Sequence, residues 1–199
     1  FIFALGVMLY HFNIDYSFGL GFHGYLGVEF FFVVAGFFMA KNAFEDENNE
    51  SVGILTGNYI LYKVKKIYVF YLVALLISIV FYMWIRKWDI KDILMGLLNS
   101  LPSYIFVDMA VYGFGGSITV GNQWFLSALF LCQLILYPIV RKKKETAVCI
   151  IFPLIGIFSL GFIYRQFQCI SPVSTDGLIV YPGIIRAMAE ISLGGGCIR

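Results

Sequence analysis

Two ionisable side chains near the start of the sequence stand in apolar surroundings, where such groups are costly and by default functional candidates. His11 follows ten uncharged residues, and a neutral imidazole held there can act as a general base. The alternative for His11 is an interfacial residue hydrogen-bonded to a carbonyl group. Glu29 stands within the apolar run that continues with Phe30, so its carboxylate needs a partner or a proton. The two residues predict acid–base chemistry.

Arg186 and Glu190 form a second ionisable pair near the end of the sequence. They are four positions apart, so on a helix they share a face and can neutralise one another. We expect them to form mainly a structural ion pair.

Three lysines precede the apolar run that begins at Ile67. Lys63, Lys65 and Lys66 stand directly before this run, and the simplest interpretation is a positively charged membrane anchor. The functional alternative is a cytoplasmic phosphate site, because lysine serves well as a point charge for phosphates. The tract Arg141–Lys144 connects two apolar runs and is expected to be an anchor.

The composition determines which class of protein must position these residues. Of the 199 residues, 60% are hydrophobic, 19% are aromatic and 13% are charged. A soluble domain carries about 25% charged residues, so this chain has too few charges for a water-facing surface. Disorder, nucleic-acid binding and a disulfide-stapled mini-protein are excluded, and the net charge of +2 indicates no acidic partner. The sequence predicts an integral membrane protein whose partner is the lipid bilayer.

A helix crosses the hydrocarbon core with about 20 mostly apolar residues. The sequence predicts six such segments, of which the first is cut short and the last is interrupted by Arg186 and Glu190. They are Phe1–Ile14, Phe22–Ala40, Ile67–Ile85, Trp124–Val140, Thr146–Tyr164 and Gly177–Ile198.

The connections between these segments differ in polarity. Phe44–Gly57 is acidic and Val111–Gln123 is rich in glycine, so both are predicted to be loops. Ile93–Val107 is short and contains polar residues, which favours an interfacial or re-entrant piece over a span.

Lysine and arginine predict the orientation in the cell membrane. If the first segment runs outward, eight of these residues face the cytoplasm and four face outward, so we expect a cytoplasmic N-terminus. His11 then lies near the outer face. The cytoplasmic residues are Lys41, Lys63, Lys65, Lys66, Arg141, Lys142, Lys143 and Lys144, and the outer ones are Arg86, Lys87, Lys91 and Arg165.

The four cysteines do not indicate a disulfide framework. Cys132, Cys149 and Cys197 lie in apolar runs and only Cys169 lies in a polar connection, so we expect small apolar core residues. The spacing of histidine and cysteine also predicts no metal site.

The order of several short motifs resembles the membrane-bound acyltransferase family three, a bacterial family that acetylates cell-surface polysaccharides and peptidoglycan. That family carries a Tyr-His near the end of its first helix, followed by a Gly-Val-Asp/Glu-Phe-Phe-Phe-Val-x-Ser-Gly-Phe run. Ala35 stands where that run usually has its serine. Lysines also stand at positions where the family frequently has arginines. The matching stretches are Tyr10-His11, Gly27-Val28-Glu29-Phe30-Phe31-Phe32, Lys63-Val64-Lys65-Lys66-Ile67-Tyr68, Trp124-Phe125-Leu126-Ser127 and Tyr137-Pro138.

The resemblance implies an all-α transmembrane bundle and an O-acyltransferase activity. The chain then represents about six helices of a larger bundle of about ten, truncated at both ends. The implied donor is acyl-CoA, most often acetyl-CoA, and the implied acceptor is a hydroxyl of an extracytoplasmic glycan in the cell envelope. No bound cofactor and no metal are implied.

The resemblance also suggests roles for the candidate residues. His11 and Glu29 are the catalytic candidates, in which Glu29 either orients the imidazole or binds the acceptor. Lys63 and Lys66 are candidates for holding the donor. Trp124 and Arg186 are candidates for the acceptor path, with an interfacial aromatic belt as the alternative for Trp124.

Two other classes of function remain open at this level. One is a transporter or flippase for a glycan or a lipid-linked precursor, in which His11, Glu29 and Arg186 line the path. The other is a non-catalytic membrane anchor or sensory module of a larger protein. A bound thioester donor distinguishes acyl transfer from transport.

Overall fold

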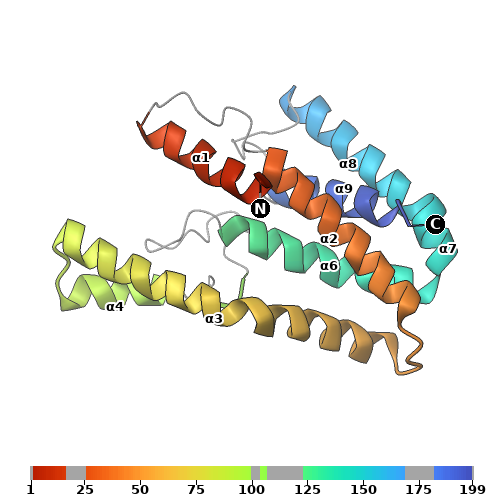
Figure 1. Ribbon diagram of the computed structural model, residues 1–199, viewed down its shortest axis with the longest axis horizontal. Coiled ribbons are helices and arrows are strands. Elements are labelled where there is room, and N and C mark those ends of the chain that lie inside the picture. The colour runs from red at the N-terminus through yellow and green to blue at the C-terminus, as the bar shows by residue number, and fades with distance from the viewer. Residues whose placement is uncertain (1, 17–25, 100–103, 107–122, 169–181, 199) are drawn as a thin grey trace.

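The protein is helical throughout the part that the structure describes. The computed structural model describes residues 2–16, 26–99, 104–106, 123–168 and 182–198. Every regular element in these ranges is a helix, as predicted (Figure 1). In chain order the elements are α1 (Ile2–Tyr16), α2 (Leu26–Glu45), α3 (Val52–Arg86), α4 (Ile90–Asn99), α6 (Gln123–Lys142), α7 (Lys144–Thr146), the π-helix η1 (Ala147–Ile151), α8 (Phe152–Phe167) and α9 (Pro182–Gly195).

Four helices are long and apolar enough to cross a membrane: Leu26–Glu45, Val52–Ile85, Trp124–Lys142 and Lys144–Phe167. These helices confirm the predicted multi-pass membrane protein. The expected first and last segments correspond to helices that are shorter than these four, α1 with 15 residues and α9 with 14. Residues 177–181, part of the last predicted segment, lie outside the described ranges.

The helices that form the bundle alternate in direction. In Figure 1, α1, α3 and α8 run one way, whereas α2, α6 and α9 run the other way. The starts of α2, α6 and α9 therefore lie toward the same end, which we call the starting end. The alternation agrees with the predicted order of crossings, and the side that faces the cytoplasm remains a prediction.

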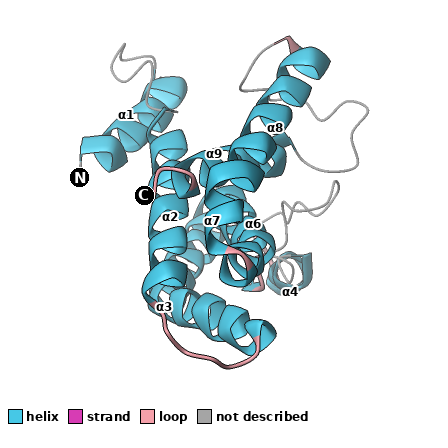
Figure 2. Cartoon of the chain, turned by 90° about the vertical axis from the view of Figure 1, so that its right-hand side faces the viewer, coloured by secondary structure: helices cyan, strands magenta, loops and turns pink. Residues whose placement is uncertain are grey.

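Helix α3 corrects two predictions. It begins at Val52 rather than at Ile67, so the predicted loop Phe44–Gly57 is helical at both ends and only residues 46–51 connect α2 to α3 (Figure 2). The Ser51 hydroxyl accepts a hydrogen bond from the amide of Ile54 and caps the helix. Acidic composition indicated a loop here, but capping and packing against α6 determine the helix.

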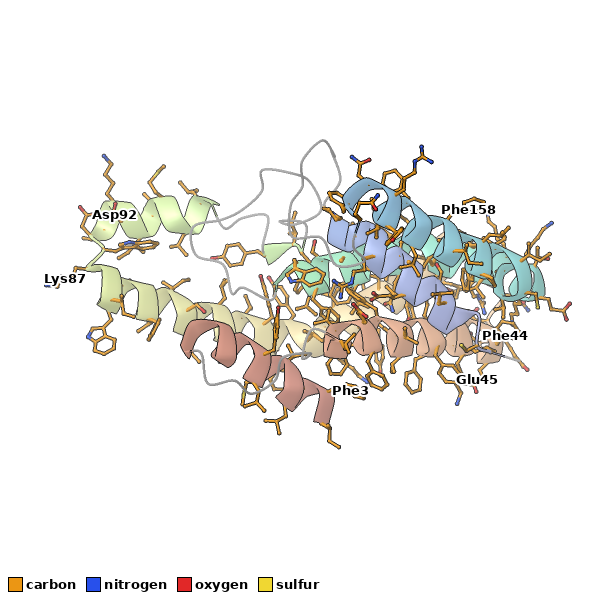
Figure 3. All side chains as sticks on the ribbon, turned by 90° about the horizontal axis from the view of Figure 1, so that it is seen from above. Phe3, Phe44, Glu45, Lys87, Asp92 and Phe158 are labelled. Carbon is orange, nitrogen blue, oxygen red and sulfur yellow. The ribbon has the colours of Figure 1, made fainter. Side chains whose placement is uncertain are left out.

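The length of α3 exceeds that of a membrane crossing. Its 35 residues extend about 52 Å at about 1.5 Å per residue, against a hydrocarbon core of about 30 Å. Figure 3 places Lys87 and Asp92 at one extreme of the molecule and Phe44 and Glu45 near the other. The short helix α4, which overlaps the first part of the predicted interfacial or re-entrant piece Ile93–Val107, packs its Leu97 against Leu75 and Ile79 of α3.

Helix α9 is the interior element of the bundle. It packs against α2, α6 and α8, and most of its residues are buried. A Cβ atom on Gly36 of α2 would meet the backbone of Ile191, and one on Gly194 of α9 would meet the backbone of Val33. Small residues allow such close approach, so these two glycines set the contact between α2 and α9.

The cysteine prediction is correct for one residue. Cys132 is buried in α6, as expected of a core residue, whereas Cys149 and Cys197 are exposed. The apolar character of their segments misled this prediction, because residues on the outside of a membrane bundle are also apolar. Cys169 and the predicted loop from 111 to 122 lie outside the described residues.

Candidate functional site

Three ionisable side chains meet at the starting end of the bundle, and we call them the carboxylate–arginine cluster: Glu29, Arg186 and Glu190. The Nη2 atom of Arg186 donates to Oε1 of Glu29 at 2.6 Å. The Nε atom of Arg186 donates to Oε1 of Glu190 at 3.1 Å. One guanidinium therefore binds two carboxylates, which confirms the predicted Arg186–Glu190 pair and supplies the partner that Glu29 required.

The cluster forms because α2 and α9 touch. Glu29 lies two turns before Gly36 on α2, and Arg186 lies two turns before Gly194 on α9. The close contact at the two glycines brings both helix starts together, so a long arginine side chain can reach the neighbouring helix. Glu29 also lies in the first turn of α2, where the positive end of the helix stabilises a carboxylate.

Trp124 contributes an aromatic surface at the start of α6. Its ring centroid lies 6.1 Å from that of Phe32 and 6.5 Å from that of Phe125, and its side chain is half-buried. Phe32 belongs to α2, one turn after Glu29. Trp124 thus packs against the core at this end of the bundle.

His11 lies in α1, and its side chain is outside the described residues. The helix packs beside the start of α2, where the rings of Phe3 and Phe30 stack at 4.0 Å. A Cβ atom on Gly27 would touch Val7 and the carbonyl of Phe3. His11 follows Val7 by four residues, so its backbone lies about 6 Å farther along the helix axis. Its catalytic role remains a prediction.

Lys63 lies within α3 and faces α6. Its Nζ atom donates to Oε1 of Gln133 on α6 at 3.3 Å and lies 4.6 Å from the ring centroid of Tyr59. Gln133 in turn donates from Nε2 to the carbonyl of Ala35 on α2 at 3.3 Å. No described carboxylate forms an ion pair with Lys63. The ammonium is therefore half-buried among neutral groups.

The other two lysines of α3 are more open. Lys65 and Lys66 are exposed, and Nζ of Lys66 lies over the ring of Tyr62, 4.4 Å from its centroid. Lys66 lies one helical turn from Lys63, and the structure gives the two lysines different neighbours. The predicted pair is thus adjacent along the helix without sharing contacts.

Gln133 and Tyr59 are two polar residues that the sequence interpretation did not single out. Gln133 is fully buried, and the buried ring of Tyr59 stacks on Tyr137 at 4.2 Å between centroids. Tyr137 donates to Oδ1 of Asn42 at 3.0 Å. The detectable signal was a glutamine inside the apolar segment Trp124–Val140, because a buried amide needs hydrogen-bond partners.

The basic tract between α6 and α7 has intramolecular partners. Arg141 donates from Nη1 to the carbonyl of Ala43 at 3.1 Å and from Nη2 to that of Asn48 at 2.7 Å. Lys144 donates to the carbonyl of Phe44 at 2.9 Å. These cations satisfy carbonyls at the end of α2, so at least these two residues are more than membrane anchors.

The described residues offer no alternative centre built on a metal. Within the ranges that the structure describes, no three histidine, cysteine, aspartate or glutamate side chains are grouped to hold a metal ion.

A family model described as an acyltransferase domain, of acyltransferase family three, matches residues 1–197. No curated protein and no solved structure matches the chain.

Proposed function

Because this chain belongs to the acyltransferase family whose model covers residues 1–197, we propose that it transfers an acyl group from cytoplasmic acyl-CoA to a hydroxyl of an extracytoplasmic glycan. Acetyl is the proposed acyl group. Membership of the family and the apolar helices establish a membrane acyltransferase in general. The donor, the acceptor and the residue roles are our proposal.

The observation that carries the proposal is the position of Lys63. A partly buried cation is costly unless it has a counter-charge, and the described neighbours of Lys63 are an amide oxygen and an aromatic ring. An anionic ligand supplies the missing charge, and the phosphates of CoA are such anions. Lys66, one turn away and exposed, is positioned to meet another part of the same ligand.

The reaction step assigned to His11 is general base catalysis. The imidazole takes the proton of the acceptor hydroxyl as its oxygen attacks the thioester carbonyl. The C–S bond then breaks, the acyl group remains on the acceptor oxygen, and the proton passes to the departing thiolate. Glu29 orients the imidazole and stabilises its positive charge, or else binds the acceptor.

The acceptor is proposed to approach the starting end of the bundle. Trp124 and Arg186 lie there with Glu29, and an aromatic face beside hydrogen-bonding groups suits a sugar ring. The predicted orientation places this end outside the cell, where the glycan is found.

Donor binding to the purified full chain in detergent tests the proposal. Lys63→Gln should weaken CoA binding at least tenfold and raise the donor KM, whereas Lys65→Gln, an exposed change on the same helix, should not. His11→Ala should bind donor normally and lose about 10²–10⁴-fold in transfer rate. Unchanged CoA binding by Lys63→Gln would refute the donor site, and near-normal turnover by His11→Ala would refute the base.

A further inference from the structure

The carboxylate–arginine cluster contains two carboxyl groups but one guanidinium. Glu29 and Glu190 each form an ion pair with Arg186, so two carboxylates share one guanidinium. If both were ionised, the cluster would carry a net negative charge inside the helical bundle, and burial strongly disfavours such a charge. Like charges that share a site commonly leave one carboxyl group protonated.

We propose that the cluster holds one proton at neutral pH and that this proton resides on Glu190, so that Glu29 remains the ionised partner of Arg186. Glu190 is then a positioning residue. Its neutral carboxyl still accepts the bond from Nε of Arg186 and turns the remaining face of the guanidinium toward Glu29.

Burial and contact length both favour Glu190 as the protonated member. Its side chain is 8% exposed, against 24% for Glu29, so ionisation of Glu190 loses more hydration. Its contact with Arg186 is also the longer one, 3.1 Å against 2.6 Å. Short contacts are typical of hydrogen bonds between ionised partners.

The second oxygen of Glu190 gives an independent argument. Oε2 of Glu190 is buried and has no hydrogen-bond partner, whereas Glu29 has no such atom among the described groups. An ionised carboxylate with a bare buried oxygen is far costlier than a neutral carboxyl in the same place.

The positions of the two carboxyl groups on their helices also favour Glu190 as the protonated member. Glu29 lies in the first turn of α2, where the helix dipole stabilises negative charge. Glu190 lies beyond the first turn of α9, so the start of its own helix gives it no such stabilisation. Of the helices packed against α9, α2 supplies Glu29, while the described charged residues of α6 and α8 form no ion pair with the cluster.

Infrared difference spectra of the purified full chain at neutral pH test where the proton lies. Exposed carboxyl groups are ionised at that pH, so a protonated carboxyl band reports a buried group. Glu190→Gln should abolish this band, and Glu29→Gln should shift the proton off Glu190 and weaken the band. Glu45→Gln, the same change in an exposed pair with Lys41 four positions away, should leave the band intact.

Thermal unfolding supplies a second readout that needs no substrate. Glu190→Gln mimics the neutral carboxyl and should hardly change the midpoint. The double variant Glu29→Gln/Glu190→Gln removes both carboxylate partners that the structure describes for Arg186 and should lower the midpoint on the order of 10 °C, more than the two single changes together.

The opposite results would overturn the inference. A band that survives Glu190→Gln and disappears in Glu29→Gln assigns the proton to Glu29. Absence of the band from the unsubstituted protein means that both groups are ionised. Neither result depends on acyl transfer, so the inference and the proposed function can fail separately.

Discussion

The two ends of α2 are both bound by cations, but through different chemistry. At the start, Arg186 from α9 binds the carboxylates of Glu29 and Glu190. At the end, Arg141 and Lys144 bind backbone carbonyls. Arg141 also forms an ion pair with the partly exposed side chain of Asp46, whose Oδ2 lies 3.8 Å from Nη1.

The two ends therefore differ in their main partners: carboxyl groups, which titrate, at the start of α2, and backbone carbonyls at its end. Backbone carbonyls do not titrate, so protonation of a partner has less effect on the contacts of Arg141 and Lys144 with the end of α2. Carboxyl groups take up protons and accept hydrogen bonds, so the charge of the starting end can change. Three measurements of stability and one of topology test whether the two ends of α2 differ in this way.

The largest effect is expected from Arg186→Gln. Removing the guanidinium takes the cationic partner from the buried Glu190 and the partly buried Glu29, and breaking a buried ion pair costs about 3–5 kcal/mol. The free energy of unfolding in detergent should fall by that amount. Arg165→Gln on the exposed side of α8 serves as the matched control and should cause no measurable loss.

Gly36→Ala should have the next largest effect. Its Cβ atom would overlap the backbone of Ile191 and push α2 from α9, which costs about 1–3 kcal/mol. Separation of the helices should also lengthen the Glu29–Arg186 contact and lower acyl transfer. A Cβ atom on Gly57 of α3 would have no neighbour within 4 Å, so Gly57→Ala should be neutral or slightly stabilising. Equal behaviour of the two variants would contradict the role of Gly36.

Arg141→Gln should have a smaller effect, confined to the other end. It removes hydrogen bonds to the carbonyls of Ala43, Asp46 and Asn48, with an expected loss of about 1–2 kcal/mol. Acyl transfer by the folded protein should be unchanged, and the exposed change Lys142→Gln provides the control. A loss as large as that of Arg186→Gln would remove the distinction between the two ends.

Single-cysteine labelling should disturb the protein least. It assigns the two ends of α2 to the two sides of the membrane. Single cysteines replace exposed Asn49 or Lys87 after Cys132, Cys149, Cys169 and Cys197 have been removed. An impermeant thiol reagent on intact cells should label position 87 and spare position 49, given the predicted cytoplasmic N-terminus. The reverse pattern would place the cluster on the cytoplasmic side and separate it from an extracytoplasmic acceptor.

Much of the helical architecture was predictable because it depends on neighbours in sequence. The runs Trp124–Val140 and Thr146–Tyr164 correspond closely to α6 and to the helices from Lys144 to Phe167. The start of α3 was not predictable in this way. Its first half contains polar residues and lysines, and packing against α6 keeps it helical.

The candidate site was predictable as a set of residues but not as an arrangement. Glu29 and Arg186 stood out as ionisable groups in apolar runs, yet 157 positions separate them and no local rule pairs them. Gln133 and Lys63, 70 positions apart, were not linked at all. The side chain of His11 lies outside the described residues, so its relation to Glu29 remains a prediction.

The membrane class, the helical fold, the resemblance to the family and the Arg186–Glu190 pair all follow from short stretches of the sequence. Hydropathy, helical period and the four-residue spacing act over short stretches of chain, so each is readable without a third dimension. The tertiary structure alone decided that Gly36 and Gly194 bring α2 against α9, that Glu29 shares Arg186 with Glu190, and that Arg141 binds the end of α2. These contacts join different helices, and their energies depend on distances that only packing fixes.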